Sequence, residues 1–151
     1  MARRLVSFFR LSFCDQGLLI QAALAVVNAK LAIRTLPLPT ARAIVTRQQR
    51  LGWMVVPVRA DRIVWAVETA SRAIPGMKNC LVQAVAAKAM LIQAGYPCEL
   101  RIGAAKKAPD ELIAHAWVES EGRVVIGDFE LDRYTPLMAP RLQSGTPRAQ
   151  L

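Results

Sequence analysis

The sequence has little of what metal sites and disulfide-stabilised folds require. Its 151 residues contain one histidine, His115, and three cysteines, Cys14, Cys80 and Cys98. The cysteines are odd in number, widely spaced and form no CxxC pair, so we expect neither a disulfide framework nor a zinc site. We also expect no cofactor. Because the chain has a single histidine, any acid–base chemistry near neutral pH is expected to involve His115.

The sequence also lacks repeats, low-complexity segments and long runs of charge. Its hydrophobic fraction of 54% excludes wholesale disorder, and its length suits one domain. The net charge is +9, but no more than two basic residues are adjacent. We therefore interpret the Arg and Lys residues as solubilising surface, with an acidic protein or peptide partner as the alternative. A nucleic-acid-binding protein is a weaker alternative, because no basic-aromatic motif or zinc-finger spacing accompanies the charge.

An apolar stretch covers residues 17–33 and is interrupted by Gln21, Asn28 and Lys30. Charged residues precede it, which does not fit the order of regions in a signal peptide. The polar interruptions also weaken the case for a membrane span. We expect a buried or partner-facing helix first, an interfacial membrane helix second and a span third.

Apolar residues at helical spacing predict helices over residues 15–34, 41–51 and 60–73. The segment 80–94 is rich in Ala, Leu and Met and predicts a further helix, which begins after Asn79 and ends at Gly95.

The second half of the chain predicts strands. We expect strands at 98–104, 113–120 and 123–129, with a polar loop at 106–111. Helices followed by antiparallel strands indicate an α+β fold. We divide the chain into a helical region at 1–73, a core at 74–135 and a loosely ordered tail at 136–151.

Cys80 is expected to be the first residue of a helix. Free backbone N–H groups and the helix dipole favour a thiolate at that position, and the thiolate is the nucleophilic form of cysteine. The structural alternative is a small apolar residue in a packed helix, which is the interpretation that we adopt for Cys14 and Cys98.

A two-residue turn at Glu121-Gly122 would pair the strands that carry His115 and Asp128. In that register Trp117 faces Ile126 and His115 faces Asp128, with Cβ atoms about 5 Å apart. The carboxylate would then orient the imidazole, as in a nucleophile–base–acid triad. The alternatives are a His packed on a strand and an Asp at a turn, and a longer loop would shift the register.

The segment NCLVQAVAAKAMLIQAGYPCELRIGA, followed by AHAWVE and GRVVIGD, resembles the B-type leader peptidases of lasso-peptide biosynthesis. These proteins are transglutaminase-like cysteine proteases. The resemblance covers residues 75–129 closely and the N-terminal half more loosely. It implies a papain/transglutaminase-like fold with N-terminal helices and a catalytic-Cys helix on a small antiparallel sheet. It also implies a triad of Cys80 as nucleophile, His115 as general base and Asp128 as orienting acid, although Asp132 lies four residues on.

The resemblance implies hydrolysis of one peptide bond, which removes the leader from a ribosomally made precursor before macrolactam formation. We expect residues 1–73 to be helical and to hold no separate leader-binding domain, so the chain resembles the split form. The expected partners are the precursor peptide, a separate leader-binding protein and the lasso cyclase. We expect a bacterial cytoplasmic protein, with weak membrane association as an alternative and no nucleic-acid partner. A transglutaminase-like acyl transferase and a non-catalytic binding module of the same fold are the alternative functions.

Overall fold

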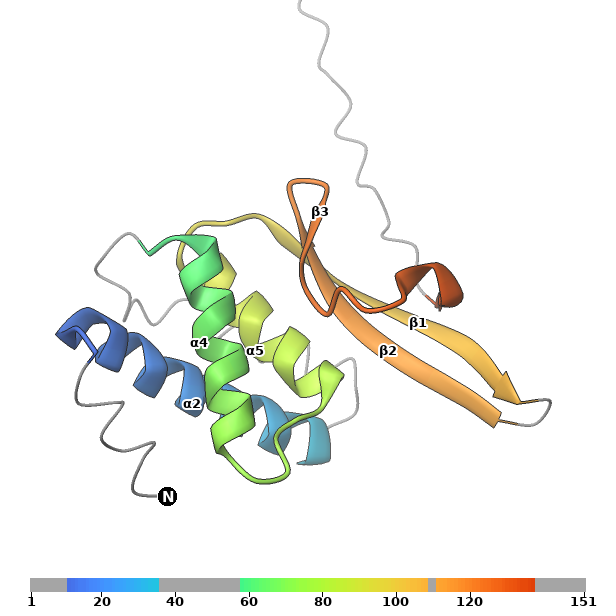
Figure 1. Ribbon diagram of the computed structural model, residues 1–151, viewed down its shortest axis with the longest axis horizontal. Helices are drawn as coiled ribbons and strands as arrows, with labels where there is room; N and C mark the ends of the chain where they lie inside the picture. Colours follow the sequence, from blue (N-terminus) through green and yellow to red (C-terminus); the bar gives the residue numbers. More distant parts are fainter. Residues whose placement is uncertain (1–10, 36–57, 109–110, 138–151) are drawn as a thin grey trace, which may run out of the picture.

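The computed structural model describes residues 11–35, 58–108 and 111–137, which form a helical layer beside a sheet (Figure 1). The helices described are α2 (Phe13–Thr35), α4 (Ala60–Ala73) and α5 (Cys80–Gln93), and a short 3-10 helix covers Leu131–Arg133. The strands are β1 (Cys98–Ala108), β2 (Glu111–Ser120), β3 (Arg123–Ile126) and β4 (Thr135–Pro136). They form one sheet in the order β3-β2-β1-β4. The predicted α+β fold, with N-terminal helices and the Cys80 helix packed on a small antiparallel sheet, is confirmed.

The predicted helices over 15–34, 60–73 and 80–94 correspond to α2, α4 and α5. The helix predicted at 41–51 lies outside the described residues. Both ends of α5 follow the sequence signals. The Asn79 side chain accepts hydrogen bonds from the backbone N–H groups of Leu81 and Val82 (2.9 and 3.4 Å). At the other end Gly95 has φ +87°, a left-handed conformation that glycine adopts without strain.

Helix α5 lies between the other two helices and the sheet (Figure 1). Its Ala84, Ala86, Ala87 and Leu91 are almost completely buried. They share one core cluster with residues of α2, α4, β2 and β3. Because three of these four residues are alanines, neighbouring elements can approach the α5 backbone closely. This packing holds the N-terminus of α5, where Cys80 lies, against the sheet.

The hairpin of β1 and β2 is longer than the sequence predicted. We expected a polar loop at 106–111, but β1 continues to Ala108 and β2 begins at Glu111. Lys106 pairs with Leu112 across the hairpin, and Lys107 forms an ion pair with Glu111 (3.0 Å). The polar residues therefore continue an exposed two-stranded ladder, where polar side chains on a solvated face are compatible with strand structure.

The turn between β2 and β3 is the predicted two-residue turn, and both of its residues have positive φ (Glu121 51°, Gly122 75°). Ser120 pairs with Arg123 as expected. The register predicted beyond that point is wrong. An irregularity after Val118 makes Val118, rather than Trp117, the partner of Ile126. In addition β3 ends at Ile126, so Asp128 is not in the ladder opposite His115.

Strand β4 was not predicted. Residues 131–137 follow β1 on the side away from β2 (Figure 1), where Gly103 pairs with Pro136 and Ala104 with Thr135. The backbone N–H of Leu137 donates to the carbonyl of Ile102 (2.8 Å). Two-residue pairing gives little sequence signal, which explains why the prediction missed it. The remainder of the predicted tail, from residue 138, lies outside the described residues.

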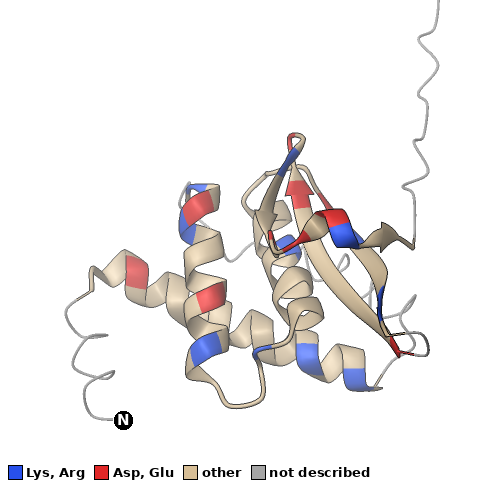
Figure 2. Cartoon of the chain, turned by 45° about the vertical axis from the view of Figure 1, so that its right-hand side comes forward, with Lys and Arg blue, Asp and Glu red and all other residues tan. Residues whose placement is uncertain are grey.

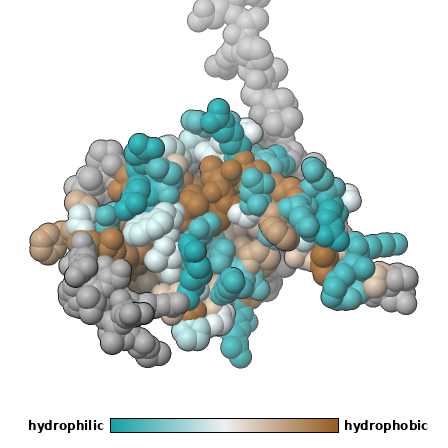
Figure 3. Space-filling view, viewed as in Figure 1, coloured by the Kyte–Doolittle hydropathy of each residue, from teal (hydrophilic) through white to brown (hydrophobic). Residues whose placement is uncertain are grey.

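Helix α2 is the one helix among the described residues that is long and apolar enough to cross a membrane by length and composition. The core helix of a globular protein can pass the same test, and one face of α2 is buried, with Leu18, Leu19, Ala22, Val26 and Ala29 in the core cluster. Acidic and basic side chains are spread over the helices and the sheet (Figure 2). On the face shown in Figure 3, apolar surface is visible between the hydrophilic side chains.

Candidate active site

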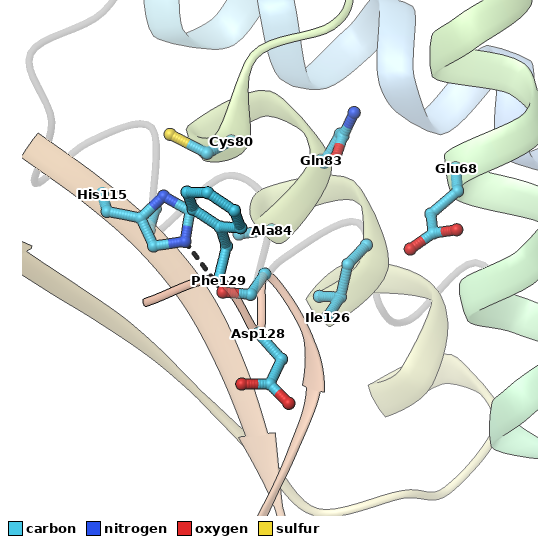
Figure 4. A pocket seen from close by; sticks show the side chains of 10 residues that line it. Glu68, Cys80, Gln83, Ala84, His115, Ile126, Asp128 and Phe129 are labelled. Carbon is cyan, nitrogen blue, oxygen red and sulfur yellow. Dashed lines mark hydrogen bonds between the residues drawn. The ribbon is translucent and has the colours of Figure 1, made fainter. Parts of the chain in front are cut away.

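Cys80, His115 and Asp128 line one pocket of about 260 Å³ (Figure 4). The pocket lies where the N-terminal turn of α5 meets β2 and the residues that follow β3. Helix α4 contributes Glu68 to the pocket, and α5 contributes Gln83 and Ala84. Ile126, Gly127 and Phe129 complete the side formed by the end of β3. Three residues that are far apart in the sequence thus share one partly enclosed space.

Cys80 is the first residue of α5 and is partly exposed. The N–H groups of Leu81 and Val82 are occupied by the Asn79 side chain, and that of Gln83 donates to the Asn79 carbonyl (3.0 Å). No hydrogen bond joins the Cys80 N–H to another described residue. The first turn therefore leaves the Cys80 amide available, and the positive end of the helix dipole lies beside the sulfur.

His115 is held by a backbone carbonyl. Its Nε2 lies 2.8 Å from the carbonyl oxygen of Gly127. A carbonyl oxygen can only accept a hydrogen bond, so Nε2 carries the proton and donates it. In the neutral ring the other nitrogen, Nδ1, is then an acceptor. Figure 4 shows that nitrogen on the edge of the ring toward Cys80. The arrangement presents the basic nitrogen of the imidazole on the side of the thiol.

Gly127 can take this position because it has no side chain. Its φ is +83°, and a Cβ added there would lie 2.8 Å from the carbonyl oxygen of Ala116 and 2.9 Å from the Cβ of Trp117. Any other residue would be strained in its backbone and would also collide with β2. Gly127 therefore lets the chain pass close to β2 at the point where its carbonyl meets His115.

Two aromatic rings lie beside the imidazole. Trp117 shares the strand face of His115 and stacks near it, with ring centroids 6.2 Å apart and an interplanar angle of 20°. Tyr134 is closer, at 5.1 Å with a tilt of 32°. The Trp117 indole N–H donates to Glu119 (2.9 Å), and Trp117 is only 5% exposed. Trp117 is therefore buried and also lies beside the histidine ring.

Asp128 lines the same pocket, but its carboxylate points away from His115 in Figure 4. The described hydrogen bonds give His115 a backbone partner, Gly127, and none to Asp128. The change of register described above explains this geometry. Asp128 follows the end of β3 and is exposed instead of standing across the ladder. Its role as the orienting acid remains a prediction.

One known protein superfamily matches most of the chain. A family model of the transglutaminase-like superfamily matches residues 23–139. The chain belongs to the transglutaminase-like superfamily. No curated protein and no solved structure matched it. The matched range contains α4, α5, the four strands that the structure describes and the described residues that line the pocket. Members of this superfamily are typically cysteine-protease-like enzymes, so membership indicates cysteine-protease or acyltransferase-type activity.

Sequence reasoning missed Gly127 and Gly103 as parts of this transglutaminase-like site. Gly127 supplies the carbonyl that holds the imidazole, and Gly103 lies opposite His115 in the β1–β2 ladder. A signal was present, because glycine within a strand pattern often marks a close approach of backbone. Glu68 was also missed, since it lies on a helix that the sequence does not connect with the pocket.

The remaining cysteines differ in their environment. Cys98 is partly buried, its thiol donates to the carbonyl of Lys88 (3.8 Å), and burial raises the pKa of the Cys98 thiol. Lys88 opposes that rise in pKa, but burial is the larger effect. Cys14 is exposed on the first turn of α2.

We therefore expect Cys98 to react more slowly than Cys14 with iodoacetamide at pH 8. Burial raises the pKa of the Cys98 thiol and also restricts access of the reagent to its sulfur. The difference should narrow as the pH rises through the raised pKa of Cys98. Peptide mapping by mass spectrometry after timed alkylation measures both rates, and unfolding in urea is the control that should equalise them. Equal rates in the folded protein would contradict the assigned environment.

Proposed function

We propose that this protein is a cysteine peptidase that removes the leader from a ribosomally made lasso-peptide precursor. The observation that carries the peptidase part is the site geometry. A cysteine at a helix N-terminus shares a pocket with the chain's single histidine, whose Nε2 is bonded to the Gly127 carbonyl. The leader-peptidase part rests on the resemblance of residues 75–129 to that family.

In the proposed reaction, Nδ1 of His115 accepts the thiol proton of Cys80, and the sulfur attacks the carbonyl carbon of the scissile bond. The tetrahedral intermediate collapses, the C–N bond breaks, and the imidazolium gives its proton to the departing amine. Water then adds to the thioester with His115 as base. The leader leaves as a carboxylic acid, and the free thiol is restored.

The oxyanion of each tetrahedral intermediate needs hydrogen-bond donors. The Cys80 N–H has no partner among the described residues and lies on the attacking residue itself, so we assign it as the first donor. Gln83 lies one helical turn along and lines the same pocket, and its side-chain amide is our candidate for the second. An ordinary helix-surface role is the alternative for Gln83.

Asp128 is proposed as the acid that stabilises the imidazolium. Its carboxylate is not bonded to the ring, so its influence would come through the electrostatic field in the pocket or after a change of side-chain rotamer. The Gly127 carbonyl keeps the imidazole oriented in either case. Removing the Asp128 charge should therefore cost less activity than removing the imidazole.

The cleavage test uses a synthetic precursor peptide, the leader-binding protein and mass spectrometry. We expect one cut with the wild-type chain, none above background with Cys80→Ala, and a loss of roughly 10²–10⁴-fold with His115→Ala. Asp128→Asn should give a smaller loss. Cys14→Ala, which removes an exposed cysteine outside the pocket, is the matched control and should cleave normally.

Cleavage that persists in Cys80→Ala would contradict the assignment of the nucleophile. The acyl-transfer alternative is tested in the same mixture. If an added primary amine captures the leader as an amide in preference to water, the protein is an acyl transferase. An intact peptide in every mixture, with the leader-binding protein shown to be bound, would favour a non-catalytic docking role.

We further propose that α2 docks the leader-binding protein. Four large apolar residues lie along the solvent side of α2 at spacings of seven, four and seven. They are Phe13, Ile20, Leu24 and Leu31, with exposed fractions of 91, 54, 60 and 54%. At 100° per residue these positions form a single stripe along the helix. The opposite face belongs to the core cluster, so α2 carries apolar residues on two sides.

Deleting α2 would not test this docking, because Ala22 and Val26 are core residues with no exposed surface. Surface substitutions are a better probe. Leu24→Ser with Leu31→Ser should weaken binding of the leader-binding protein about tenfold or more in isothermal titration calorimetry, since two exposed leucines would no longer be buried. Leu112→Ser, at an exposed leucine of the distant hairpin, is the control. Unchanged affinity in the double variant would exclude the stripe as the docking surface.

A further inference from the structure

Residues 131–137 form a strap that pairs with the edge of β1 and places Tyr134 beside His115. We propose that Tyr134 is a positioning residue, whose ring holds the His115 imidazole with Nδ1 toward Cys80. This inference rests on the proposed function only in assigning the base role to His115.

The imidazole is restrained from three directions. The Gly127 carbonyl fixes Nε2 at 2.8 Å, the Trp117 ring stacks at 6.2 Å, and the Tyr134 ring packs at 5.1 Å. Trp117 comes from the same strand as His115, and Gly127 follows β3. Tyr134 is the one member of this set that belongs to the strap. Aromatic contacts at these separations favour a limited set of ring orientations.

The sheet leaves space for the Tyr134 side chain at Gly103. A Cβ added to Gly103 would lie 2.9 Å from the Cβ of Tyr134 and 3.1 Å from two carbons of the Trp117 ring. Gly103 pairs directly with His115 in the β1–β2 ladder, so the space lies at the histidine's own position in the sheet. The glycine thus lets both aromatic residues that flank the imidazole approach β1.

The strap is fixed on both sides of Tyr134. Before it, the backbone N–H of Tyr134 donates to the Leu131 carbonyl (2.9 Å), which closes the short 3-10 helix. After it, Thr135 and Pro136 pair with β1, and the Leu137 N–H donates to Ile102 (2.8 Å). The ring of Tyr134 is therefore presented by ordered backbone.

The argument requires an aromatic ring and not the phenol group. No hydrogen bond joins the Tyr134 hydroxyl to another described residue. Tyr134→Phe should therefore preserve the orientation of His115, whereas Tyr134→Leu keeps an apolar side chain but removes the ring. Rotation of the imidazole would then break the Nε2 bond to Gly127 and turn Nδ1 away from Cys80.

Because the chain has one histidine, ¹⁵N-histidine labelling gives one imidazole signal set in NMR. We expect the Nε2–H tautomer in the wild type and in Tyr134→Phe, and a mixture of tautomers in Tyr134→Leu. Cleavage by Tyr134→Leu should show kcat reduced roughly 10- to 100-fold with KM little changed, because the base is misplaced but the substrate contacts remain. Leu137→Ala, an exposed residue at the end of the strap, is the control and should match the wild type.

Unchanged imidazole signals or unchanged kcat in folded Tyr134→Leu would overturn the proposal, as would equal losses in Tyr134→Phe. If Tyr134→Leu does not fold, Gly103→Ala is the second variant, because its Cβ displaces Tyr134 and should also give mixed tautomers. A single tautomer in folded Gly103→Ala would count against the proposal. Failure of the peptidase assignment would be distinguishable, because cleavage would then be retained in Cys80→Ala. The imidazole signals would still test the role of Tyr134 in that case.

Discussion

The site depends on the packing of α5 between the helices and the sheet. A helix that contacts neighbours on both sides has little freedom to shift, and the small side chains of Ala84, Ala86 and Ala87 bring those neighbours close. Asn79 fixes where the helix begins, so Cys80 lies beside β2 and the residues that follow β3. The positive end of the α5 dipole and the available N–H of Cys80 lie beside the sulfur. The proposed chemistry uses both.

The histidine side of the site depends on two glycines more than on the predicted carboxylate. Gly127 brings a carbonyl to Nε2, and Gly103 makes room for the aromatic residues on either side of the ring. A backbone carbonyl can set the tautomer of an imidazole as a carboxylate does, but it brings no negative charge to stabilise the imidazolium. In the proposed mechanism Asp128 supplies that negative charge through the field in the pocket, without direct contact with the ring. The space at Gly103 is also what allows Tyr134 of the strap to lie beside His115, in a site built mainly on β2 and α5.

Local signals in the sequence were sufficient for the three α-helices that the structure describes and for the position of Cys80 at the start of α5. Asn79 and Gly95 determine the ends of α5, and the Glu121-Gly122 turn has the predicted form. The predicted pairing of His115 with Asp128 was wrong, because one irregularity after Val118 shifts the β2–β3 ladder by a residue. No local sequence pattern indicates this irregularity. Strand β4 and the contact of Tyr134 with His115 depend on how a short segment folds back across β1, which only the three-dimensional arrangement reveals.

The most direct test of the central claim is to look for the covalent intermediate on Cys80. Precursor peptide, leader-binding protein and enzyme are mixed, quenched in acid within milliseconds to seconds, and analysed by intact-mass and peptide-mapping mass spectrometry. The account predicts a leader-sized thioester on Cys80 that disappears on longer incubation. A thioester on Cys14 or Cys98, or rapid cleavage with no adduct on Cys80 at any time, would contradict it.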